Sequence, residues 1–148
     1  GVTLASASSV DESVVKTLAD ALGQTDCLLI FEGTPLLVSE AQRSVFDYYI
    51  VDVSAAADDY DLEMAINHAL NWGVSAERLM LGSVHGRTVT DNDKTVHSSL
   101  NRAAYFVQNA GPLAGVGIYD VGTDYYNSDI IYKQTRGLIQ QLNPAKGK

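Results

Sequence analysis

The feature that most constrains the fold of this chain is an alternation of short apolar runs with longer segments of helical spacing. Strand-like runs are predicted at residues 1–5, 27–31, 48–53, 78–84 and 115–119. Helices are predicted at 12–22, 39–46, from the aspartates at 58–61 to Gly73, at 98–108 and at 129–142. Strands that alternate with helices favour a parallel sheet with right-handed crossovers. The chain is therefore expected to be an α/β domain of about five βα units.

Two architectures fit this order of elements. The first is part of a (β/α)8 barrel, which needs about 250 residues as a whole. The second is an open doubly wound parallel sheet. The chain has 148 residues and no visible linker or low-complexity tract, so we expect residues 1–148 to form a single domain. Both architectures place ligands at the carboxyl ends of the strands.

Local signals at the helix and strand ends sharpen these boundaries. Ser8, Ser9 and Asp11 offer N-cap oxygens for the helix at 12–22, and Gly23 is expected to end it. The run at 27–31 is apolar at successive positions, which predicts a strand covered on both faces. Pro35 is expected in the loop that follows.

Composition and missing motifs exclude several classes of function. Ten basic residues stand against eighteen acidic ones, so the net charge is −8. Such acidity argues against a nucleic-acid binder, because phosphates require basic side chains. A single cysteine, Cys27, excludes an internal disulfide and a multi-thiolate metal site. No apolar run approaches the roughly 20 residues of a membrane helix. Because no phosphate-binding or dinucleotide fingerprint occurs either, we expect no cofactor and no metal.

The candidate site consists of the polar and aromatic side chains that end the predicted strands or follow them. They are Glu32, Asp52, Ser54, His85, Tyr119, Asp120 and Tyr125. The carboxylates suit acid/base chemistry or ligand binding, and they equally suit capping of the next helix. The tyrosines suit stacking on the apolar face of a sugar, and they equally suit the core.

Several segments together resemble glycoside hydrolase family 18, in particular its endo-β-N-acetylglucosaminidase-like branch and relatives in Bacteroidetes glycan-use systems. The resemblance covers roughly residues 26–145. It is carried by CLLIFEG at 27–33, FDYYIVD at 46–52, GVSAERLML at 73–81, GVGIYD at 115–120, DIIYKQTR at 129–136 and LNP at 142–144. Members of this family fold as (β/α)8 barrels, so the resemblance implies that the chain corresponds to strands four to eight, the C-terminal part of a larger barrel.

The resemblance also bears on catalysis. The family carries spaced aspartates that end in a glutamate along its fourth strand, and that glutamate is the general acid. The matching stretch here is residues 1–8, GVTLASAS, which contains no carboxylate. Hydroxyl and methyl groups do not protonate a glycosidic oxygen near neutral pH. On the sixth strand, Asp52 and Ser54 stand where the family has a glutamine and a tyrosine. We therefore assign no catalytic residue and lean against an enzyme.

These points lead to a ranked set of functions. The first is a non-catalytic glycan-binding protein of a polysaccharide or glycoprotein-glycan uptake system, with a ligand that contains N-acetylglucosamine. The second is part of an active endo-β-N-acetylglucosaminidase or chitinase whose carboxylates lie upstream of Gly1. The third is a free-standing α/β module that binds a partner. A second polypeptide that completes the barrel is a further expected partner, and the resemblance implies a cell-surface or periplasmic location.

Overall fold

A parallel sheet organises the chain, as the sequence predicts. The computed structural model describes residues 1–53, 59–82 and 113–116, together with residues 125, 136 and 139. The strands are β1 (Val2–Ala5), β2 (Leu29–Glu32), β3 (Tyr48–Asp52), β4 (Leu79–Gly82) and β5 (Gly115–Val116). Every neighbouring pair is parallel.

The strand order distinguishes the two expected architectures. The strands lie side by side in the order β1-β2-β3-β4-β5, which is also their order along the chain. A doubly wound sheet reverses its strand order at a switch point. No reversal occurs among the described strands, and sequential order is the arrangement of a (β/α)8 barrel. The described fold is therefore part of an α/β barrel.

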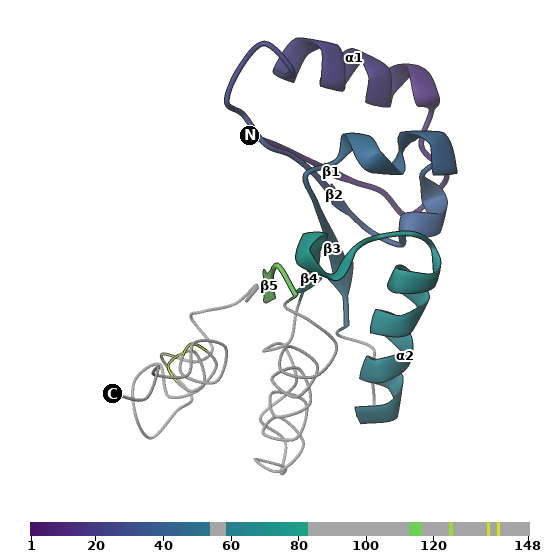
Figure 1. Ribbon diagram of the computed structural model, residues 1–148, viewed down its shortest axis with the longest axis vertical. Coiled ribbons are helices and arrows are strands. Elements are labelled where there is room, and N and C mark those ends of the chain that lie inside the picture. The colour runs from purple at the N-terminus through teal and green to yellow at the C-terminus, as the bar shows by residue number, and fades with distance from the viewer. Residues whose placement is uncertain (54–58, 83–112, 117–124, 126–135, 137–138, 140–148) are drawn as a thin grey trace.

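The helices follow the strands and lie outside the row that the strands form (Figure 1). They are α1 (Glu12–Leu22) and α2 (Asp59–Asn71), with the short 3-10 helices η1 (Pro35–Leu37), η2 (Glu40–Val45) and η3 (Ala76–Arg78). The predicted helix at 12–22 is confirmed residue for residue. Asp11 caps it, because its carboxylate accepts hydrogen bonds from the backbone N–H and the hydroxyl of Ser13, both at 2.7 Å.

The hydrophobic core lies between the helices and one face of the sheet. Alternate residues of the strands, such as Phe31, Tyr49 and Leu81, are buried on that face. Phe31, Phe46 and Tyr49 form a cluster of three edge-to-face rings whose centroids lie 5.4 to 5.8 Å apart. Val15 of α1 and Ile66 of α2 are fully buried in the same core.

The opposite face of the sheet corrects one expectation. It carries Thr3 and Ala5 of β1, Ile30 and Glu32 of β2, Tyr48, Ile50 and Asp52 of β3, and Met80 of β4, and these residues are half-buried or exposed. Within the described part of the chain, the run at 27–31 is therefore covered on one face, whereas the sequence predicts that it is covered on both. The described helices, α1 and α2 with the 3-10 helices, pack on one face only; Ile30 is half-buried and Leu28, before β2, is 45% exposed.

Several boundaries also differ from the sequence prediction. β2 begins at Leu29 rather than Cys27, and Arg78 belongs to η3 rather than to β4. Pro35 opens η1, since the fixed φ of proline suits the first position of a helical turn. The segment predicted as a helix at 39–46 is the 3-10 helix η2. The predicted helices at 98–108 and 129–142 lie outside the described residues. No described helix is long and apolar enough to cross a membrane.

Candidate functional site at the strand ends

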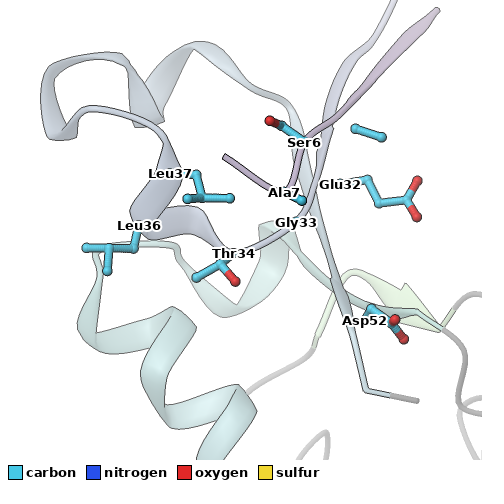
Figure 2. Close-up of a pocket in the computed structure, with 9 residues that line it drawn as sticks. Ser6, Ala7, Glu32, Gly33, Thr34, Leu36, Leu37 and Asp52 are labelled. Atoms are coloured by element: carbon cyan, nitrogen blue, oxygen red, sulfur yellow. The ribbon is translucent and has the colours of Figure 1, made fainter. Parts of the chain in front are cut away.

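A hollow opens where β1, β2 and β3 end (Figure 2). Its volume is about 670 Å³, and it is open to solvent. Its wall is formed by Ala5, Ser6, Ala7, Glu32, Gly33, Thr34, Leu36, Leu37 and Asp52. We call it the strand-end groove. It lies at the carboxyl ends of the strands, where barrel and open-sheet proteins both bind ligands.

Backbone hydrogen bonds carry the sheet past the last residue of each strand and so hold the groove in shape. The Ser6 N–H donates to the Glu32 carbonyl at 3.1 Å, and the Gly33 N–H donates to the Ile50 carbonyl at 3.0 Å. The Ser6 hydroxyl donates to the Ser8 carbonyl at 2.7 Å, which turns the chain away from the sheet. The polar groups that border the groove are therefore attached to hydrogen-bonded backbone rather than to a free loop.

Glu32 and Asp52 provide the negative charge of the groove. Glu32 pairs in register with Ile50, and Asp52 lies two residues beyond Ile50 on β3. Side chains two residues apart on a strand share a face, so both carboxylates lie on the face opposite the helices. Figure 2 shows both pointing to the same side, away from Leu36 and Leu37. Glu32 is half-buried and Asp52 is exposed.

Gly33 determines how the chain leaves β2. Its φ is +145°, a conformation that other residues rarely adopt. A Cβ at this position would lie 2.5 Å from the Ser6 carbonyl oxygen. The absence of a side chain therefore lets the chain bend directly after Glu32 and pass close to β1.

The apolar side of the groove comes from residues that sequence analysis missed. Thr34, Leu36 and Leu37 follow Gly33, and Leu36 is 58% exposed. Pro35 is fully buried beneath them and starts η1. The sequence does show a proline and two leucines directly after a predicted strand end. Which of these side chains is exposed depends on the turn that the chain makes here, and the sequence alone does not give that turn.

The structure places three of the predicted site residues. Glu32 and Asp52 come together at the groove, whereas Tyr125 is described as an exposed residue that does not line it. Ser54, His85, Tyr119 and Asp120 lie outside the described residues, so their part in the site stays a prediction. Within the described part of the chain, no three His, Cys, Asp or Glu side chains gather as metal ligands would.

Comparison with known proteins supports the fold through structure rather than sequence. No family model matches the chain. No curated protein matches it either. Its fold is similar to a selenomethionine-labelled variant of the protein BT1044, with a TM-score of 0.65 and 18% identity. That match covers 93% of this chain and 48% of the other.

A second solved structure has the same fold. It is an endo-β-N-acetylglucosaminidase from Cordyceps militaris, with a TM-score of 0.62 and 16% identity. The match covers 96% of this chain and 55% of that enzyme. The chain thus spans about half the length of each solved neighbour. At these identities the likeness shows a shared fold, consistent with the resemblance to glycoside hydrolase family 18, and the activity must be argued from the site.

Proposed function

We propose that this chain binds a glycan in the strand-end groove and does not hydrolyse it. The observation that carries the proposal is that the side chains of β1 on the same face as Glu32 include no carboxylate. The register pairs Thr3 with Ile30 and Ala5 with Glu32, so Thr3 and Ala5 lie on the same face as Glu32. Ala7 lines the groove beyond them. In the family that the sequence resembles, this strand carries the catalytic carboxylates.

The groove has the mixture of surfaces that a sugar needs. Leu36 and Leu37 supply an apolar wall on one side of the groove, against which the C–H face of one pyranose ring would pack, and the carboxylates on the other side would meet a different part of the glycan. Glu32 and Asp52 supply acceptors for sugar hydroxyls, and hydrogen bonds to ionised acceptors are the stronger kind. Thr34 adds a hydroxyl at the border between the two.

Charge narrows the class of glycan. Two carboxylates line the groove and the chain carries a net charge of −8, so sialylated or sulfated glycans are repelled. A neutral glycan rich in N-acetylglucosamine or mannose meets no such penalty. We include N-acetylglucosamine in the proposal because of the sequence resemblance and because one structural neighbour is an endo-β-N-acetylglucosaminidase.

The proposal extends to context. A role in glycan uptake implies a location at the cell surface or in the periplasm. We also propose that a second polypeptide continues the sheet beside β1. β1 is an edge strand of the described sheet, and its Val2 and Thr3 are exposed. Co-purification followed by light scattering tests this partner. A lone monomer of 15.9 kDa would contradict that part of the proposal.

One observation favours hydrolysis as a second candidate function. Glu32 and Asp52 end neighbouring strands on one face, and most families of glycoside hydrolases, though not the substrate-assisted family 18, use a pair of carboxylates that flank the scissile bond. In that case one of the two would be the general acid.

A single experiment separates the two functions. The purified chain is titrated with chitin oligosaccharides and with a high-mannose glycan that retains its N-acetylglucosamine pair, while products are followed by mass spectrometry. Saturable binding in the micromolar range without new products supports a binding protein. Cleavage that is lost in Glu32→Gln or Asp52→Asn supports the hydrolase. If the chain neither binds nor cleaves these glycans, the glycan assignment is overturned.

A further inference from the structure

A second hollow lies mainly at the amino ends of the strands, away from the carboxyl ends where the strand-end groove opens. It is lined by Leu36, Glu40, Arg43, Ser44, Asn71, Trp72, Gly73 and Arg78, and its volume is about 420 Å³. η2 directly precedes β3 and η3 directly precedes β4, so both lie near the amino ends of these strands. The end of α2 comes shortly before η3 in the chain. We call this hollow the arginine pocket. Only Leu36 also borders the strand-end groove.

Two half-buried arginines are held in place here by neutral partners. Arg43 donates from Nε to the Val38 carbonyl at 3.1 Å and from Nη1 to the Trp72 carbonyl. Arg78 donates from Nε to the Asp47 carbonyl at 3.2 Å and from Nη2 to the Ser44 carbonyl at 3.0 Å. These bonds fix both guanidinium groups, but a carbonyl oxygen does not neutralise a full positive charge.

The arginines retain both charge and donors. A guanidinium group carries five N–H donors, and each of these two uses part of its set on backbone carbonyls. Neither forms an ion pair among the described residues. The two positive charges also act on the hydroxyl of Tyr49. Burial raises the pKa of Tyr49 to about 12, and the charges of Arg78 and Arg43 oppose this increase.

We propose that the arginine pocket binds a small oxyanion, a phosphate group or a carboxylate. Arginine forks match such groups with paired hydrogen bonds, and here the side chains are ordered before a ligand arrives. Asn71 and Ser44 line the same pocket and add polar groups. The site is distinct from the proposed glycan groove in position and in charge, so either proposal can fail without the other.

Glu40 sets the strength of this site. It lines the pocket and is exposed, and its carboxylate opposes the charge of the two arginines. Removing that negative charge should tighten anion binding roughly fivefold, the scale for a unit charge about 4 Å away that is screened as in bulk water, because Glu40 is exposed. Glu77 is the matched control, because it is an exposed glutamate of η3 that does not line the pocket.

Trp72 provides the readout. It lines the pocket and is the only tryptophan of the chain, so fluorescence excited selectively at tryptophan, away from the absorption of the eight tyrosines, reports on this site. The 148-residue protein is titrated with inorganic phosphate in one arm and with acetate in the other, at an ionic strength held constant with chloride. We expect a saturable change with at least one of them. A response to phosphate alone identifies phosphate groups as the ligand class, and a response to both includes carboxylates.

The variants decide the proposal. Glu40→Gln should lower the dissociation constant roughly fivefold, and Glu77→Gln should leave it unchanged. Arg43→Lys and Arg78→Lys keep the charge but lose the fork, so each should weaken binding several-fold in protein that circular dichroism shows to be folded. The absence of a saturable response in wild-type protein and in Glu40→Gln, or an equal response in both glutamate variants, would overturn it.

Discussion

Glu32 and Asp52 are the last residues of two neighbouring parallel strands, and their carboxylates lie on the same face of the sheet (Figure 2). This follows from the register, because Glu32 pairs with Ile50 and Asp52 is one alternation further along β3. Asp52 lies twenty positions after Glu32 in the sequence. The parallel crossover is what brings them to one groove.

This relationship predicts the effect of removing either charge on glycan binding. Glu32→Gln and Asp52→Asn each keep the size of the side chain but lose an ionised acceptor. We expect each to weaken binding about tenfold, the usual scale for a hydrogen bond to a charged group. Isothermal titration calorimetry measures the change. Glu77→Gln carries the same loss of charge away from the groove and should bind like the wild type.

Gly33→Ala should destabilise the protein by about 2 kcal/mol or more. Its φ of +145° is unfavourable for alanine, and the new Cβ would lie 2.5 Å from the Ser6 carbonyl oxygen. Gly73→Ala is the control, because φ is +86° but no atom lies within 4 Å of the added Cβ. Strain alone should cost about 1 kcal/mol there. Urea denaturation compares the two, and equal losses would refute a close approach of β1 at Gly33.

Tyr49→Phe should reduce stability at neutral pH by about 1 to 2 kcal/mol. The Tyr49 hydroxyl donates to the Arg43 carbonyl at 2.9 Å, and its removal leaves that acceptor unsatisfied next to the core. Equilibrium unfolding in urea at pH 7 measures the loss. A variant as stable as the wild type would show that this hydrogen bond adds nothing to the fold.

The same tyrosine predicts how stability changes at high pH. Burial raises the pKa of Tyr49 to about 12 in the folded state, against an ordinary value of 10.0. The unfolded chain thus releases this proton first, so the stability that Tyr49 contributes is complete below pH 10 and is lost as pH rises from 10 towards 12. The wild type should lose more stability over this window than Tyr49→Phe. Parallel pH curves for the two proteins would contradict the prediction.

Asp11 predicts a change of stability at the acid end. Hydrogen bonds from the Ser13 hydroxyl and backbone N–H lower the pKa of its carboxyl below 3.8. Because this pKa is lower in the folded than in the unfolded chain, the contribution of Asp11 to stability is present above pH 4. It disappears as the pH falls through the pKa of the folded state. Asp11→Ser keeps a capping oxygen that does not titrate. The melting temperature of the wild type, relative to this variant, should fall below pH 4 and stay constant above pH 5.

Local signals were sufficient for the elements that local chemistry controls. The N-cap candidates Ser8, Ser9 and Asp11 and the apolar spacing after them predicted the bounds of α1, because an N-cap and a helical face are properties of consecutive residues. β3 was predicted within one residue from its aromatic and β-branched run. Pro35 and Arg78 were assigned incorrectly, since short 3-10 turns lack a hydrophobic period that a sequence pattern can show.

By itself, the sequence determined the class of fold, its strands and the two acidic strand ends, because alternation and apolar spacing are read along the chain. Only the tertiary structure decided the order of the strands, the face on which the described helices pack and the wall formed by Leu36 and Leu37. It alone brought Arg43 of η2 and Arg78 of η3 into one pocket. Each of these depends on the register between segments far apart in sequence, and register is set by packing and hydrogen bonding in three dimensions.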